Sequence, residues 1–225
     1  MIFFENVSKI YNDCFALKNI NLRIAPREFV SFVGRSGAGK TTLVKLLIGE
    51  YKPTSGSIFV NNIDITTMKH QLFPFYRRKV GIVFQDFKLL SFRTAYENIS
   101  FAMEVANLPH KKIKEDTSKI LRIIGLEDRK NNFPAQLSGG EKQRIAIGRA
   151  LALKPEILVA DEPTGNLDPI HTWDIINLLV KINELGTTVI LASHDKDIIN
   201  SLGKRVVSLD NGRVIRDEQE GRFIV

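Results

Sequence analysis

The sequence predicts an α/β fold with a mostly parallel, doubly wound sheet, and three observations support this prediction. Short apolar runs typical of strands alternate with segments of helical periodicity in the first and last thirds of the chain. Between residues 94 and 151 the strand signal disappears and only helical patterns remain, which indicates a helical block inserted into one α/β domain. The chain has 225 residues, 44% hydrophobic and 25% charged, as is typical of a single globular domain.

Each expected element follows from its local pattern of apolar residues. Strands are expected where these residues alternate or form compact runs, at residues 2–7, 19–24, 28–33, 57–60, 80–84, 157–160, 188–193, 205–209 and 212–216. Helices are expected at helical spacing, directly after the glycine-rich turn at 34–39 and at residues 94–106, 110–124, 140–152 and 170–185. Gly148 lies inside one expected helix, where a glycine costs up to ~1 kcal/mol.

Composition and charge limit the possible classes of function. The chain has 32 Lys and Arg against 25 Asp and Glu, a net charge of +7. This balance suits a nucleotide, a nucleic acid or an acidic membrane face, but it is also typical of surplus surface lysines. The single cysteine, Cys14, excludes an intramolecular disulfide and is expected to be a small buried hydrophobe. No stretch approaches the ~20 apolar residues of a spanning helix, and Glu5 and Lys9 interrupt the N-terminal apolar run, so no signal peptide is expected.

The strongest motif is a complete G-x-x-x-x-G-K-[ST] pattern between an expected strand and an expected helix. Its residues, with the threonine that follows, are Gly34, Arg35, Ser36, Gly37, Ala38, Gly39, Lys40, Thr41 and Thr42. Glycines in such a loop let backbone N–H groups wrap a phosphate, and the helix N-terminus adds a favourable potential. Lys40 supplies a cation for the β- and γ-phosphates, and the Thr41 hydroxyl can coordinate Mg²⁺. The motif predicts binding of a nucleoside triphosphate.

Two carboxylates, Asp161 and Glu162, follow the apolar run at residues 157–160. The carboxyl ends of parallel strands are where α/β folds bind ligands, so both side chains are expected at that edge of the sheet. Asp161 is expected in the Mg²⁺ shell, and Glu162 is expected to accept a proton from an attacking water as general base. The pattern is weak alone but becomes specific beside the phosphate-binding loop.

A serine followed by two glycines opens the helix expected at residues 140–152. The segment is Leu137-Ser138-Gly139-Gly140-Glu141. Taken alone it is typical of a simple serine N-cap. Beside a phosphate-binding loop and an Asp-Glu strand end, it favours a second anion-binding helix terminus. A triphosphate would then be held from two sides.

Taken in order, the segments GRSGAGKTT, LSGGEKQR, ILVADEPTGNLD and SHD resemble the ATP-binding cassette (ABC) ATPase family, over essentially the whole chain. The resemblance implies a P-loop NTPase fold with a mostly parallel sheet core, N-terminal antiparallel β elements and an inserted α-helical subdomain. It implies a RecA-like core at about residues 1–86 and 153–225 and a helical subdomain at about residues 87–152. It also implies an active, Mg²⁺-dependent ATPase. Two copies would form a head-to-tail homodimer, in which Ser138 and Gly140 of one subunit close over the ATP on the P-loop of the other.

The resemblance further assigns roles to single residues. Gln85 matches the Q-loop glutamine that senses Mg²⁺ and the attacking water, Asn166-Leu167-Asp168 matches the D-loop that crosses the dimer seam, and His194 matches the switch histidine that contacts the γ-phosphate. Tyr11 matches the aromatic ring that stacks on adenine, although a tyrosine near a strand is more often part of a core. The other histidines, His70, His110 and His171, are expected to be structural or solvated.

These assignments give three sets of residues. The expected catalytic residues are Lys40, Gln85, Glu162 and His194. The expected nucleotide-binding residues are Tyr11, Gly34 to Thr42, Ser138, Gly139, Gly140 and Asp168. The expected metal ligands are Thr41, Gln85 and Asp161.

Two classes of cassette protein fit these motifs, a membrane-partnered ATPase and a nucleic-acid-linked ATPase. The basic runs at residues 77–79 and 111–114 have little aromatic interleaving for base stacking, so the membrane interpretation is favoured. It implies a peripheral protein at the cytoplasmic side of the membrane, with anionic lipid as a further candidate partner. Its membrane subunit would dock near residues 86–101, with Phe87, Leu89, Leu90 and Phe92 as contacts, unless these four pack the subdomain core. EPTGNLD is also shared with cassettes of lipoprotein-release and macrolide or peptide exporter systems.

Overall fold

The computed structural model describes residues 2–223, and the chain divides into two compact units. The first unit contains Met1–Arg77 and Asn183–Val225, and the second contains Arg78–Ile182. All the strands and helices expected from the sequence are present. The division into a core and a helical subdomain at about residues 86 and 152 stays a prediction.

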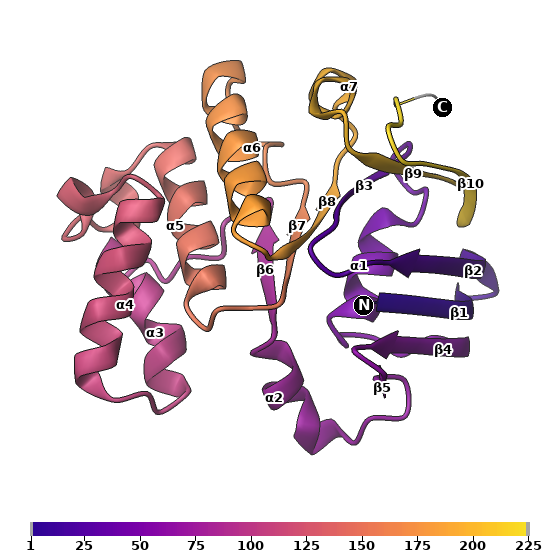
Figure 1. Cartoon of the computed structure of the whole chain (residues 1–225), viewed down its shortest axis with the longest axis horizontal. Helices are drawn as coiled ribbons and strands as arrows, with labels where there is room; N and C mark the ends of the chain where they lie inside the picture. Colours follow the sequence, from indigo (N-terminus) through magenta and orange to yellow (C-terminus); the bar gives the residue numbers. More distant parts are fainter. Residues whose placement is uncertain (1, 224–225) are drawn as a thin grey trace. The chain divides into compact units, whose positions relative to one another are not determined.

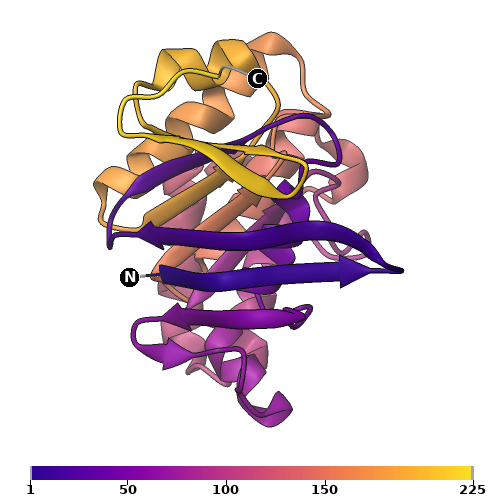
Figure 2. The same ribbon diagram turned by 90° about the vertical axis from the view of Figure 1, so that its right-hand side faces the viewer.

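The first unit begins with an antiparallel sheet in the order β2-β1-β4-β5, as predicted for the N-terminal region (Figure 2). Its strands are β1 (Ile2–Tyr11), β2 (Cys14–Ile24), β4 (Ser55–Val60) and β5 (Ile63–Asp64). Strands β1 and β2 extend beyond the predicted runs because the two-residue turn Asn12-Asp13 joins them directly, with both residues at positive φ. Cys14 follows that turn and is exposed, so the expectation of a buried cysteine was wrong.

The same unit contains four neighbouring strands in the order β10-β9-β3-β8. They are β3 (Phe29–Val33), β8 (Thr188–Ala192), β9 (Arg205–Asp210) and β10 (Arg213–Glu218). β3 pairs in parallel with both β8 and β9, and every residue of β3 is buried, which explains why its sequence is apolar except for Ser31. β9 and β10 form an antiparallel hairpin around the turn Asn211-Gly212, in which both residues have positive φ.

Helices complete the first unit. They are α1 (Lys40–Leu47), η1 (His70–Leu72), α2 (Phe73–Arg77) and α7 (Lys196–Leu202). α1 follows β3 through the glycine-rich loop, as predicted. α7 was not expected from the sequence because it is short, but Asp195 marks its start: the carboxylate accepts hydrogen bonds from the backbone N–H groups of Asp197 and Ile198.

The second unit combines two parallel strands with the helical block. The strands are β6 (Val80–Phe84) and β7 (Ile157–Asp161), and the helices are α3 (Ala95–Val105), α4 (His110–Ile123), η2 (Glu127–Arg129), η3 (Pro134–Gln136), α5 (Gly139–Leu151) and α6 (Pro169–Glu184). Helices α3, α4 and α5 pack side by side (Figure 1).

Gly148 explains how closely these helices approach. A Cβ atom placed on Gly148 of α5 would lie 3.0 Å from methyl groups of Ile120 and Ile124 and 3.1 Å from one of Ile99. The glycine therefore lets α3 and α4 pack directly against the backbone of α5, which offsets its low helix propensity.

Within residues 2–223, no helix is both long enough and apolar enough to cross a membrane.

Candidate functional site

Two glycines of the phosphate-binding loop of the first unit, Gly34 and Gly39, cannot be replaced without displacing backbone. A Cβ atom on Gly34 would lie 2.3 Å from the carbonyl oxygen of Leu209. A Cβ atom on Gly39 would lie 2.7 Å from the carbonyl oxygen of Ala16, and Gly39 has a φ of 107°. The loop is therefore packed against β2 on one side and against the β9–β10 hairpin on the other.

Lys40 lies within this loop rather than in solvent. It is 6% exposed, and its Nζ donates hydrogen bonds to the carbonyl oxygens of Gly34 at 2.8 Å and Arg35 at 3.3 Å. The first turn of α1 has no acidic residue, and its N-cap Gly39 contributes no side-chain hydrogen bond. A lysine held against the loop and a helix N-terminus, whose dipole favours negative charge, form the environment that a phosphate group requires.

His194 belongs to the first unit and lies at the same edge of its sheet as this loop. Strands β3 and β8 are parallel, with Phe32 opposite Ala192, and the backbone N–H of Ser193 donates to the carbonyl oxygen of Phe32 at 3.1 Å. Gly34 and His194 each follow within two residues of these strand ends. The structure thus brings together two of the predicted motifs, the phosphate-binding loop and the switch histidine.

Tyr11 ends β1, and its ring belongs to an aromatic and cationic cluster. The ring packs edge-on against Tyr51 with centroids 5.9 Å apart, and the Lys9 ammonium lies 4.9 Å from its centroid. Partial burial raises the pKa of the Tyr11 hydroxyl. At 39% exposure the ring is accessible for stacking on a base. The sequence analysis missed Tyr51, since nothing local distinguishes it from an ordinary surface tyrosine.

The second unit contains the other predicted catalytic groups at one strand edge. β6 and β7 are parallel, with Phe84 opposite Asp161, so Gln85 and Glu162 follow at neighbouring positions. A Cβ atom on Gly165 would lie 2.7 Å from Nε2 of Gln85, which shows that this side chain packs on the segment after Glu162.

The Gln85 segment and the segment after Glu162 are also joined by hydrogen bonds. Asn166 Nδ2 donates to the carbonyl oxygen of Gln85 at 3.1 Å, and Gln85 Nε2 donates to Asn166 Oδ1 at 3.5 Å. Asn166 is a site residue that the sequence analysis named only as part of the D-loop. The carboxylate of Asp161 and the amide oxygen of Gln85 are hard oxygen donors of the kind that Mg²⁺ prefers. Asp161 and Gln85 of this unit therefore have the donor chemistry that a magnesium ion requires, and Thr41, which belongs to the first unit, stays a predicted ligand.

Ser138 is the N-cap of α5. Its hydroxyl accepts a hydrogen bond from the backbone N–H of Glu141 at 3.2 Å, and the Glu141 carboxylate accepts one from the backbone N–H of Ser138 at 2.8 Å. This second bond lowers the pKa of Glu141. The simple N-cap weighed in the sequence analysis is therefore present, and α5 begins at a rigidly held terminus.

The glycines after Ser138 pack on the D-loop. A Cβ atom on Gly139 would lie 3.2 Å from a methyl group of Leu167, and one on Gly140 would lie 2.7 Å from Cδ2 of His171. The Asp168 carboxylate accepts hydrogen bonds from His171, and the bond from its backbone N–H is the main cause of a lowered Asp168 pKa. His171, which the sequence analysis expected to be structural or solvated, thus contacts two motifs.

Comparison with known proteins identifies the class. Residues 17–165 match the ABC transporter family, and the chain belongs to this family. Its fold is that of solved ABC cassettes. One of these is the dimeric post-hydrolysis state of the ATP-binding cassette MJ0796, bound to ADP and Pi. It superposes with a TM-score of 0.88 at 36% identity, and the match covers 99% of this chain and 100% of that chain. The chain is therefore an ATPase that binds ATP with Mg²⁺.

The chain is also similar over nearly its whole length to characterised bacterial proteins. It is 46% identical to the cell division ATP-binding protein FtsE of Bacillus subtilis (strain 168), covering 99% of this chain and 98% of that protein. It is 44% identical to the protein of the same name from Mycobacterium tuberculosis (strain ATCC 25618 / H37Rv), with the same two coverages.

Proposed function

We propose that this chain is the ATPase subunit of a membrane complex that acts in cell division. The observation that carries the proposal is its full-length similarity, at 44–46% identity, to proteins named for cell division. In the proposed complex, two copies close on ATP and transmit a mechanical signal through a membrane subunit resembling FtsX. The signal controls peptidoglycan hydrolases beyond the membrane, and this chain lies peripherally at the cytoplasmic face.

In the proposed reaction each predicted site residue has a distinct role. Lys40 binds the β- and γ-phosphates, which replace the loop carbonyls as partners of its Nζ. Glu162 accepts a proton from the attacking water, Gln85 orients that water, and His194 contacts the γ-phosphate. Thr41, Gln85 and Asp161 would hold Mg²⁺, which when bound would supply positive charge next to the phosphate oxygens. Tyr11 stacks on adenine. The Ser138 to Gly140 segment and Asp168 contact the nucleotide that is bound to the P-loop of the second copy.

The proposed docking segment for the membrane subunit is residues 86–101. Within it Phe87, Leu89 and Leu90 are partly exposed and Phe92 is 73% exposed, so none of the four is in the core. Their backbone is held firmly: Arg149 of α5 donates to the carbonyl oxygen of Phe87 at 2.9 Å. Apolar side chains presented on a fixed backbone are typical of a binding surface.

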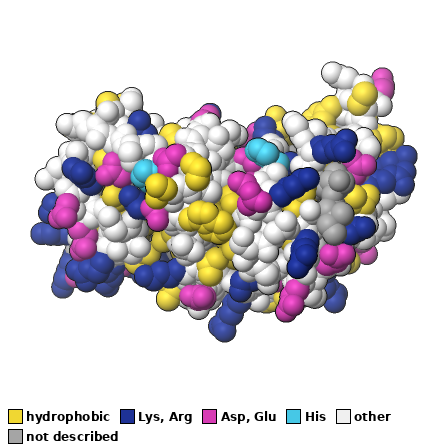
Figure 3. All heavy atoms as spheres, turned by 90° about the horizontal axis from the view of Figure 1, so that it is seen from above, with side chains coloured by type: hydrophobic (Ala, Val, Ile, Leu, Met, Phe, Trp, Pro, Cys, Tyr) yellow, Lys and Arg dark blue, Asp and Glu magenta, His cyan; other side chains and the backbone are white. Residues whose placement is uncertain are grey.

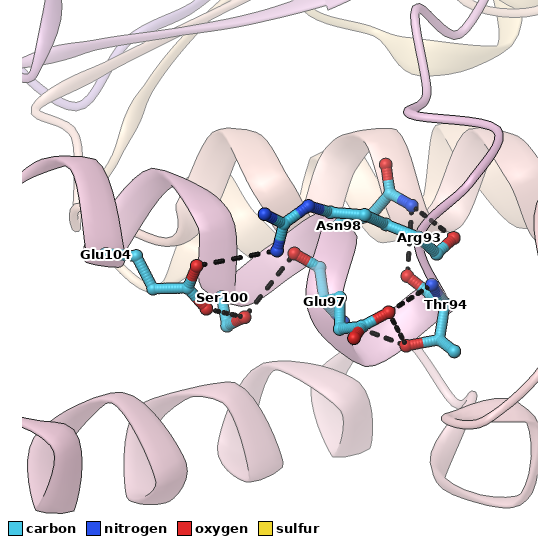
Figure 4. A network of polar contacts seen from close by, with 6 residues as sticks. All are labelled: Arg93, Thr94, Glu97, Asn98, Ser100 and Glu104. Atoms are coloured by element: carbon cyan, nitrogen blue, oxygen red, sulfur yellow. Dashed lines mark hydrogen bonds and ion pairs between the residues drawn. The ribbon is translucent and has the colours of Figure 1, made fainter.

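A polar network at the start of α3 fixes the same segment (Figure 4). The buried Asn98 side chain accepts from the backbone N–H of Leu90 and donates to the carbonyl oxygens of Leu90, Arg93 and Thr94, at 2.8–3.1 Å. Thr94 and Glu97 form a capping box, in which the hydrogen bond from the Thr94 backbone N–H lowers the pKa of Glu97. These hydrogen bonds therefore hold the segment rigidly against the start of α3. A force applied at Phe92 would then be transmitted to the helical block.

The charge distribution gives no support to the nucleic-acid alternative. On the face shown in Figure 3, Asp and Glu side chains lie among the Lys and Arg side chains, which do not form one continuous basic stripe. A protein that binds phosphate backbones usually gathers its cations along one face. The net charge of +7 is therefore interpreted as a general surplus.

The proposal is tested by isolating tagged Glu162→Gln chain with ATP from membranes of its native cells and identifying the bound subunit. We expect a membrane protein resembling FtsX, and we expect that adding Phe92→Ser to the Glu162→Gln chain releases it. Phe92→Ser alone, with Glu162 intact, should retain ATP hydrolysis. Phe75→Ser is the matched control, because Phe75 is 61% exposed but lies on α2 in the other unit. An exporter permease, a lipoprotein-release subunit, or tight DNA retention at physiological salt would overturn the proposal.

A further inference from the structure

His171 connects two motifs that would otherwise be separate loops of the second unit. It lies in the first turn of α6, three residues after Asp168. Its backbone N–H donates to Asp168 Oδ1 at 3.1 Å, and its ring Nδ1 lies 2.5 Å from Asp168 Oδ2. The carboxylate is thereby hydrogen-bonded to His171 through both of its oxygens. A hydrogen bond to a charged group is among the stronger single contacts of a partly exposed side chain.

The other side of the imidazole packs on the glycine turn of α5. A Cβ atom on the buried Gly140 would lie 2.7 Å from Cδ2 of His171 and 3.0 Å from its Cβ and Cγ. The backbone at Gly140 therefore lies directly against the ring. Leu167 makes the corresponding contact with Gly139, at 3.2 Å from the position of a Cβ there. The D-loop and the start of α5 thus pack against each other. His171 joins them, because it hydrogen-bonds to Asp168 of the D-loop and packs its ring on Gly140 of α5.

We propose that His171 is a positioning residue that sets the Ser138 to Gly140 turn and Asp168 in a fixed relation for contact with a second copy of this chain. The inference rests on the proposed ATP-closed dimer, in which both segments meet the nucleotide bound by the partner copy. A turn and a carboxylate held together enter that contact already ordered, which lowers the cost of closing the dimer. Nothing in this role involves the P-loop of the same copy.

This role predicts that His171 variants lose dimerisation but keep ATP binding to the monomer, whereas a misfolded variant would lose both. His171→Phe keeps a flat ring against Gly140 but removes the donor to Asp168, and His171→Gln keeps a donor but removes the ring. In a Glu162→Gln background, the ATP concentration for half-maximal dimerisation is measured by size exclusion with light scattering. We expect about a tenfold increase for His171→Phe and a smaller one for His171→Gln, which restores part of the contact. Binding of a fluorescent ATP analogue to the monomer should be unchanged.

Two controls make the outcome decisive. His110→Phe changes an exposed histidine in the first turn of α4 in the same unit, and should leave dimerisation as it was. Combining His171→Phe with Asp168→Asn should add little to the larger single effect if the two residues act as a pair. Equal dimerisation of the His171 variants and the parent, or a parallel loss of monomer nucleotide binding, would overturn the inference. If the parent itself fails to dimerise with ATP, the proposed dimer is wrong instead.

Discussion

The contact between the β9–β10 turn and the phosphate-binding loop gives the sharpest test of how this site is held. The backbone N–H of Gly212 donates to the carbonyl oxygen of Ala38 in the loop at 3.1 Å, and the carbonyl oxygen of Gly212 accepts from the N–H of Lys18 at 2.7 Å. Gly212 has a φ of +72°, and a Cβ atom there would lie 2.7 Å from the carbonyl oxygen of Ala16. Gly212→Ala should therefore push the turn away from β2 and the loop together.

The size of the effect follows from two contributions. An alanine in the left-handed region costs about 1 kcal/mol, and weakening two backbone hydrogen bonds adds about 2 kcal/mol. Gly203→Ala is the matched control: Gly203 has a φ of +56°, but no atom lies within 4 Å of its Cβ position, so only the first contribution applies. For a chain of this size about 1 kcal/mol shifts Tm by 2–4 °C. We expect Tm to fall by about 2–4 °C for Gly203→Ala and by about 6–12 °C for Gly212→Ala.

Nucleotide affinity separates a loop effect from a general loss of stability. Moving Ala38 alters the curvature of the phosphate cradle, so we expect the Kd of Gly212→Ala for ATP to rise on the order of tenfold, well below its melting range. Gly203→Ala should bind ATP like the parent. Thermal unfolding monitored by circular dichroism and titration with a fluorescent ATP analogue measure the two quantities. Equal Tm losses in both variants, or an unchanged Kd in Gly212→Ala, would refute the reasoning.

Three further predictions follow from single residues. Lys40→Ala removes the cation held in the loop and should abolish measurable ATP binding in the same titration; retained affinity would exclude the loop as the phosphate site. Glu162→Gln should bind ATP, turn it over at least 100-fold more slowly in a phosphate-release assay and accumulate as a dimer, whereas undiminished turnover would remove Glu162 from the general-base role. Arg27 has a φ of 62°, which favours glycine, so Arg27→Gly should raise Tm by about 1–3 °C; a decrease would mean that the Arg27 side chain itself stabilises the fold.

The sequence predicted the elements and most of the site because both leave local patterns. β3 is a run of buried apolar residues and the loop after it has fixed spacings, so neither depends on distant parts of the chain. The β1–β2 hairpin around the turn Asn12-Asp13 was not predicted, because its strands are irregular. The pairing of β1 with β2 has register shifts near Val7 and Lys9. Asn166 was named only within the D-loop and His171 was expected to be structural or solvated, because an amide and a lone histidine are common surface residues. An aspartate three positions before His171 at a helix start was the available signal.

The residues that hold the site in shape are of a different kind from those that carry the motifs. Arg205, buried at the start of β9, donates two hydrogen bonds to Asp217 at 2.7 Å and one to Glu28 at 2.8 Å, and these bonds raise its pKa. The cluster fixes the open end of the β9–β10 hairpin to the segment just before β3, while Gly212 fixes the closed end to the phosphate-binding loop. Both ends of the strand that leads to the loop are thereby tied to one hairpin. Because each tie joins residues far apart in the chain, a sequence can contain every motif and still lack the geometry that makes them a site.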